Sequence, residues 1–86
     1  MTIQELKYAL ISGRPVVIEK GHIRTEGTVT AVLLQTERDT IVPRAEVKTT
    51  LGGIERHTLN RLNFKDPTGI EKLVNICVSN TTKIHF

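Results

Sequence analysis

Aromatic residues are nearly absent from this chain, which contains Tyr8, Phe64 and Phe86 and no tryptophan. Its hydrophobic fraction is 38%, below the usual value of about 45–50%, a range that also counts glycine. A domain of 86 residues buries only about 60%, or slightly more, of the surface of its unfolded chain. The sequence therefore predicts a single small domain, residues 1–86, with a core built from aliphatic side chains.

Cysteine and long apolar segments are also scarce. Cys77 is the single cysteine, so no disulfide can form within the chain, which suits a reducing compartment. No apolar run approaches the ~18 residues of a membrane span, and the N-terminus lacks a basic segment followed by an apolar one. These absences predict a soluble, cytoplasmic protein without a membrane partner.

Residue spacings typical of catalytic or metal sites are missing as well. His22, His57 and His85 do not pair with one another or with Cys77 at a zinc-type spacing. We expect these histidines to face solvent or lie in turns. Cys77 lies in an apolar run, residues 73–78, which favours a packed, inert cysteine over a nucleophile. The sequence therefore predicts a protein that is not an enzyme and uses no metal or cofactor.

What the chain does contain is a β region, residues 15–65, with β-branched residues in period-2 alternation. From Ile41 to Leu51 the odd positions are mostly apolar, whereas the even positions from residue 44 to residue 50 are polar. One face for a core and one for water is the pattern of a half-buried strand. From Ile23 the odd positions again share one face. The residues expected to form the core are Leu6, Leu10, Val16 or Val17, Val29, Leu33, Val47 and Leu51.

Glycine and proline divide this β region. Gly21 stands where a tight turn needs a positive φ, and the pair at 52–53 between two strand-like runs predicts a hairpin. Gly27 lies inside a strand and predicts a bulge or sharp bend there. Pro43 has no N–H to donate to a ladder, so its end of the strand is expected to be an edge.

Two helices are expected to flank the strands. Thr2 and Glu5 have the spacing of a capping box, and Gly13 can end the helix in the left-handed conformation, which predicts a helix over residues 3–12. Residues 69–78 match a helical stripe, although some of them also match a strand; the turn signals before them favour the helix. Residues 82–86 are then expected to form a terminal strand.

The order of these elements carries a resemblance. A short N-terminal helix, then Val16–Ile18 ahead of Gly21, and Gly27 ahead of Val29, resembles the opening of Sm-like and SH3-like small barrels over residues 3–60. The fold class expected is mainly β within α+β: a small, bent antiparallel sheet or an SH3-like or Sm-like barrel. The resemblance implies this fold and brings no ligand residues with it.

Consecutive apolar residues at Val32, Leu33 and Leu34 indicate a strand covered on both faces. Val32 and Leu34 are expected on the face that carries Arg24, and together with Pro43 they are the predicted protein interface. The leading hypothesis is a non-catalytic small binding module whose partner is another protein or another copy of itself, with a dimer favoured. Such simplicity is typical of accessory or inhibitor proteins of phages and mobile elements.

Nucleic-acid binding is the first alternative. The net charge is +3, from 12 basic and 9 acidic residues, which is too small by itself to imply such a partner. The β region offers one aromatic residue, Phe64, for base stacking, so any binding is expected to be weak and governed by phosphate contacts. The side chains expected to make those contacts are Arg24, Arg44, Lys48, Arg56 and Arg61.

A second alternative is a protein that sequesters a small molecule in a pocket between subunits. Such pockets need a few convergent polar groups in an apolar cleft. The sequence alone does not locate them.

Overall fold

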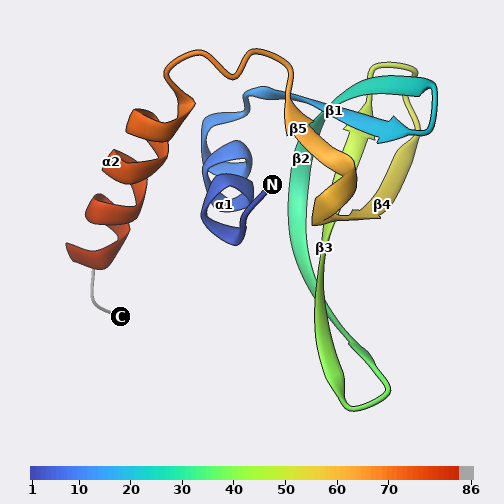
Figure 1. Cartoon of the computed structure of the whole chain (residues 1–86), viewed down its shortest axis with the longest axis horizontal. Helices are drawn as coiled ribbons and strands as arrows, with labels where there is room; N and C mark the ends of the chain where they lie inside the picture. The colour runs from blue at the N-terminus through green and yellow to red at the C-terminus, as the bar shows by residue number, and fades with distance from the viewer. Residues whose placement is uncertain (84–86) are drawn as a thin grey trace.

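The β region folds into one five-stranded antiparallel sheet, and the computed structural model describes residues 1–83 of the chain. The strand order is β4-β3-β2-β1-β5, and α1 lies between the sheet and α2 (Figure 1). This is an α+β fold dominated by strands, as expected from the alternation. In chain order the elements are α1 (Ile3–Ser12), β1 (Pro15–Lys20), β2 (Ile23–Glu37), β3 (Thr40–Thr49), β4 (Ile54–Thr58), the 3-10 helix η1 (Leu59–Arg61), β5 (Leu62–Phe64) and α2 (Ile70–Lys83).

Helix α1 has the range and the two caps expected from the sequence. The Glu5 backbone N–H donates to Thr2 Oγ1 at 3.1 Å, and the Thr2 backbone N–H donates to Glu5 Oε1 at 2.9 Å. These two bonds satisfy N–H groups that have no partner within the helix. At the other end Gly13 adopts a φ of 71°, which a residue with a side chain rarely tolerates.

Helix α2 is longer than expected and replaces part of the predicted terminal strand. It spans Ile70–Lys83, so it continues past residue 78, where the predicted helix ends, and past Asn80. Asparagine is only a weak helix breaker, and neither glycine nor proline follows Gly69. Thr82 and Lys83 are therefore helical, and residues 84–86 of the predicted strand lie outside the described residues.

The sheet is open rather than closed into a barrel. Among residues 1–83, β4 pairs only with β3, and β5 pairs only with β1. Both strands are therefore edges of the sheet. Strand β5 has only three residues and β4 only five, and short edge strands limit unwanted pairing.

A bulge at Thr30 decides which residues of β2 reach the core. Val29 pairs with Val47 and Ala31 with Glu46, so Thr30 is the extra residue. After a one-residue slip every side chain changes face, and Val32 instead of Leu33 continues the core face. The predicted core position of Leu33 is therefore wrong, as is the predicted placement of Val32 and Leu34 on the polar face.

Gly27 lies three residues before this bulge and is needed for a different reason. A Cβ atom at Gly27 would lie 2.5 Å from Val47 Cγ1 and 2.7 Å from the Lys48 carbonyl oxygen. The close approach of β3 to β2 at this point requires a residue without a side chain.

The core lies between α1, the sheet and the first turns of α2. Two more expected core positions are wrong: Leu10 is exposed on α1, and Leu51 is 89% exposed because β3 ends at Thr49 and Leu51 belongs to the following turn. Val17 is buried on the opposite face of the sheet from Val16. The buried residues that pack together are Leu6, Tyr8, Ala9, Val16, Ile18, Val29, Ala45, Val47, Leu62, Phe64, Ile70 and Val74.

Candidate functional site

A long hairpin arm projects from the sheet (Figure 1). Strand β1 pairs with β2 only as far as Thr28, and β4 pairs with β3 only from Arg44 onward. Between these points β2 and β3 pair with each other alone, up to the turn after Glu37. We call residues 29–43 the hairpin arm. It is built only from local pairing, and its outer half pairs with no third strand within the described chain.

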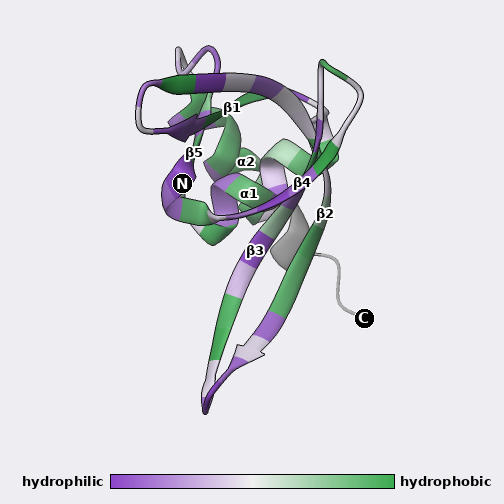
Figure 2. Cartoon of the chain, turned by 90° about the vertical axis from the view of Figure 1, so that its right-hand side faces the viewer, coloured by the Kyte–Doolittle hydropathy of each residue, from purple (hydrophilic) through white to green (hydrophobic). Residues whose placement is uncertain are grey.

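One face of the arm continues the core face of the sheet. Val32 pairs with Ala45, which is fully buried, and Leu34 pairs with Pro43, whereas Ile41 lies opposite Thr36. Directly paired residues share a face, so Val32, Leu34, Ile41 and Pro43 form one apolar strip, the arm surface. Figure 2 shows hydrophobic segments on both strands of the arm.

This arm surface becomes more exposed with distance from the core. Val32 packs against the core and Pro43 is half-buried, but Leu34 is 68% and Ile41 is 65% exposed. Leu33 and Val42 lie on the other face and are half-buried. Isolated exposed apolar residues are common, whereas neighbouring ones on one face of a projecting hairpin mark an interaction surface or an aggregation hazard.

The two long edges of the arm differ in their capacity to pair with another strand. The β3 edge carries Pro43, which has no N–H to donate. The β2 edge, residues 31–37, contains neither proline nor glycine, and among residues 1–83 no strand lies beside it. Pro43 was predicted at a strand edge, and it lies just beyond the last residue that pairs with β4.

A second candidate site lies at the base of the arm, where basic side chains surround a hollow of about 430 Å³. We call it the basic hollow. Strands β1, β3 and β4 and the 3-10 helix η1 all contribute to it. Its lining residues are Lys20, Arg44, Arg56, His57, Thr58 and Arg61.

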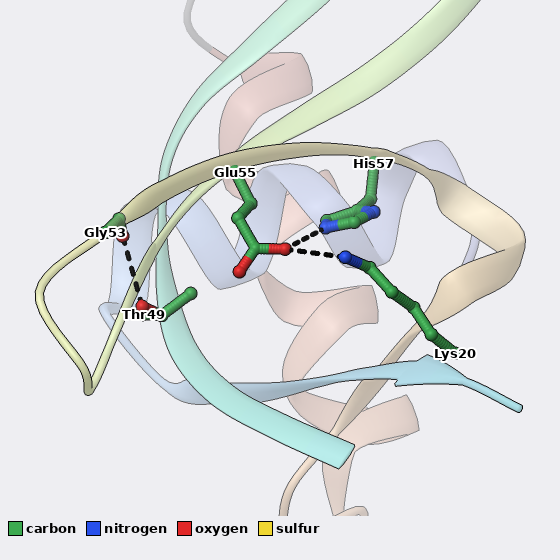
Figure 3. Close-up of polar contacts among 5 residues, drawn as sticks. All are labelled: Lys20, Thr49, Gly53, Glu55 and His57. Carbon is green, nitrogen blue, oxygen red and sulfur yellow. Dashed lines mark hydrogen bonds and ion pairs between the residues drawn. The ribbon is translucent and has the colours of Figure 1, made fainter. Parts of the chain in front are cut away.

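Glu55 holds two of these side chains, Lys20 and His57, in place through polar contacts (Figure 3). Its Oε1 accepts a hydrogen bond from Lys20 Nζ at 2.9 Å and lies 2.9 Å from His57 Nε2. The Lys20 hydrogen bond, with that of His57, lowers the pKa of Glu55 below its ordinary value of 4.5. Because an ionised carboxylate only accepts, Nε2 of His57 is the donor in this contact. The network joins β1 to β4, two strands that do not pair with each other.

The arginines of the basic hollow differ in their partners. Arg44 is paired with Glu37, and Arg56 Nε lies 3.7 Å from Glu46 Oε2. Arg61 is exposed and takes part in no ion pair within residues 1–83. The hollow therefore contains one cation without a carboxylate partner beside others that are already neutralised.

The structure brings together three of the five predicted nucleic-acid contacts. Arg44, Arg56 and Arg61 line the basic hollow. Arg24 lies apart, 3.8 Å from Glu19, and Lys48 is not part of the lining. Sequence reasoning missed Lys20 and His57, since their meeting depends on how far the sheet curves.

The histidines and the cysteine lie as follows. His57 was expected to face solvent and is instead only 7% exposed, because it follows the core-facing alternation of β4 opposite Ala45. His22 is exposed beside the β1–β2 turn, and His85 lies outside the described residues. Cys77 packs against the core from α2. The described residues contain no cluster of three or more metal-ligating side chains.

Two further hollows border α2. One, of about 730 Å³, runs along the helix itself, and the other, of about 560 Å³, lies between the N-terminal ends of the two helices and residues Val74 and Val78. Neither is lined by arginine or histidine.

Within residues 1–83, no helix has both the length and the apolar character needed to cross a membrane.

Comparison of the chain with protein-family models, with curated proteins and with solved structures finds no match.

Proposed function

We propose that this protein is a non-catalytic binding module that associates with a second copy of itself through the hairpin arm. The observation that carries the proposal is the arm surface: a strip continuous with the core face whose outer members, Leu34 and Ile41, remain exposed. A domain with so few large apolar residues gains much from covering them.

Self-association is favoured over a different partner because the β2 edge can pair with a second copy of itself. Two antiparallel copies of one strand edge can pair about a two-fold axis, and each copy then presents the same residues to the other. Residues 31–37 supply an uninterrupted edge of this kind. Pairing there would place Leu34 of one protomer against the arm surface of its partner. Pro43 disfavours the corresponding use of the β3 edge.

A second part of the proposal concerns the fold class, beyond the open antiparallel sheet described above. We propose that this open sheet is related, in its chain order, to the SH3-like and Sm-like small barrels. Its support is the connection from β4 to β5, where η1 takes only three residues to carry the chain from one edge of the sheet to the other. The Lys20–Glu55 ion pair adds a polar bridge across the side that strand pairing leaves open.

The arm proposal is tested by Leu34→Glu. A glutamate at an interface introduces two like charges at the centre of a two-fold contact, so we expect a folded protein with half the solution mass of the wild type. Leu51→Glu is the matched control, since Leu51 is even more exposed and lies in the β3–β4 turn; it should leave the mass unchanged. Light scattering gives the mass and circular dichroism the folded state. Equal masses for the wild type and both variants would contradict the proposal.

Nucleic-acid binding through phosphate contacts is a second candidate function. The observation that favours it is the convergence of Arg44, Arg56 and Arg61 on the basic hollow. Affinity for a single-stranded oligonucleotide should then fall steeply with salt, and removing one of these arginines should lower the log–log slope by about 1. Absence of binding at low salt would remove this candidate.

A metabolite that co-purifies with the protein would point instead to small-molecule sequestration between subunits.

A further inference from the structure

The basic hollow holds more positive charge than the nearby carboxylates neutralise. Glutamates pair with Lys20, Arg44 and Arg56, but no carboxylate is among the lining residues. Arg61 has no such partner among residues 1–83, so one full positive charge remains. His57 adds an imidazole ring to the same lining.

Arg44 contributes an unsatisfied hydrogen-bond donor. Its Nη2 donates to Glu37, while its Nε is buried and has no acceptor within the described structure. A buried N–H group without an acceptor costs stability, and such groups are rare in folded proteins. The Arg44 side chain as a whole is 26% exposed, so a small shift of the side chain would let an oxyanion supply the acceptor that Nε lacks. The planar guanidinium is also suited to binding two oxygens of one phosphate or carboxylate.

The lining also indicates which class of anion fits. No aliphatic residue and no Phe, Tyr or Trp lines the hollow, so it offers neither an apolar wall nor a large stacking platform of the kind that binds organic rings. One cation that is unpaired within residues 1–83, Arg61, beside cations that already have carboxylate partners around about 430 Å³ suits a compact anion whose charge is concentrated on a few oxygens. A phosphate group has this charge density and several acceptor oxygens.

We propose that the basic hollow binds a phosphate group, carried either by a free phosphorylated compound or by a nucleic-acid backbone. Arg61 is the exposed donor left for it, a shift of the Arg44 side chain would add the Arg44 Nε, and Glu55 positions Lys20 and His57 at its wall. The inference does not depend on self-association. It supplies a site for the second candidate function but does not require a polynucleotide ligand.

The test is calorimetric titration of the full chain with inorganic pyrophosphate and, separately, with a short oligothymidylate at low salt. Arg61→Ala removes an exposed side chain without an ion pair, so the variant should stay folded. We expect it to weaken pyrophosphate binding by about tenfold or more, the loss typical of one charge-assisted hydrogen bond. Arg24→Ala is the matched control, because Arg24 is an exposed arginine of β2 outside the hollow. It should bind like the wild type.

The two ligands separate the source of the phosphate. Pyrophosphate binding that depends on Arg61, without oligothymidylate binding, supports the site and removes the nucleic-acid function. Arg61-dependent binding of oligothymidylate supports the site with a backbone as its ligand. Failure of both ligands to bind the wild type would overturn the proposal. Equal weakening by Arg61→Ala and Arg24→Ala would also overturn it, since diffuse surface charge would then account for the binding.

Discussion

At the scale of single residues, Glu55 has the most consequential contacts. It joins Lys20 of β1 to His57 of its own strand, and Lys20 lies 35 residues away in sequence. The alternation of β4 predicts that Glu55 and His57 share a face. That this face turns toward the core, and toward the end of β1, follows only from the curvature of the sheet. Neither this pair of residues nor their contact with Lys20 was predicted from the sequence.

Glu55→Gln should alter the acid limb of the stability curve. Hydrogen bonds from Lys20 and then His57 lower the pKa of Glu55 in the folded state below its ordinary value of 4.5. A lowered folded-state pKa contributes stability above the unfolded-state value, and this contribution is lost as the pH falls through the folded-state value. The wild type should therefore exceed the variant in free energy of unfolding near neutral pH, and the difference should shrink below about pH 4.5.

Urea denaturation at a series of pH values measures this difference. Glu71→Gln controls for the loss of one negative charge, because Glu71 is exposed on α2 and forms no ion pair within residues 1–83. A constant difference between wild type and Glu55→Gln down to pH 3 would show that the contacts of Glu55 do not contribute as described.

At the scale of elements, β2 shows how far a sequence pattern can be followed. Its odd positions share one face up to Val29, which reaches the core while Ile23 at the start is 65% exposed, and the bulge at Thr30 then reverses the faces. No sequence signal at Thr30 predicts a bulge, since threonine is an ordinary strand residue. The bulge or bend was predicted at Gly27 instead, because a glycine inside a strand is the usual sequence signal for a bulge. Helix α1 was predictable because both of its caps are local, whereas no glycine or proline after Gly69 marks where α2 ends.

Gly27→Ala should destabilise the protein by about 1–3 kcal/mol. The added methyl group would meet the Lys48 carbonyl oxygen at 2.7 Å as well as Val47 Cγ1 at 2.5 Å, and backbone cannot move aside as a flexible side chain can. Gly53→Ala is the matched control, because the nearest atom to its Cβ is Thr49 Oγ1 at 3.7 Å. It should change stability little. Chemical denaturation of both variants compares them, and equal effects would refute the close approach of β2 and β3.

At the scale of the whole molecule, the helices cover one part of the sheet and leave the hairpin arm uncovered. The helices cover the sheet where β1 and β4 flank β2 and β3, while the hairpin arm continues alone (Figure 1). The sequence located the apolar segment at Val32–Leu34 but assigned its faces incorrectly. The correction strengthens the interface hypothesis, since Leu34 now extends the core face instead of interrupting a polar one.

The candidate sites were predictable to different degrees for the same reason. Apolar runs and lone prolines can be found in a sequence, so the arm residues Val32, Leu34 and Pro43 were identified. A hollow assembled from four elements depends on long-range pairing, so only its arginines could be anticipated and not their common position. Arg24 and Lys48 share the chemistry of those arginines but not their location.

The most direct test of the central claim is the solution mass of the unmodified protein, measured by sedimentation equilibrium over a range of concentrations up to high micromolar. Association through the hairpin arm predicts a mass that rises with concentration to twice the 9.6 kDa of one chain and no further, because a two-fold contact is closed. A mass that stays at 9.6 kDa throughout would contradict the account.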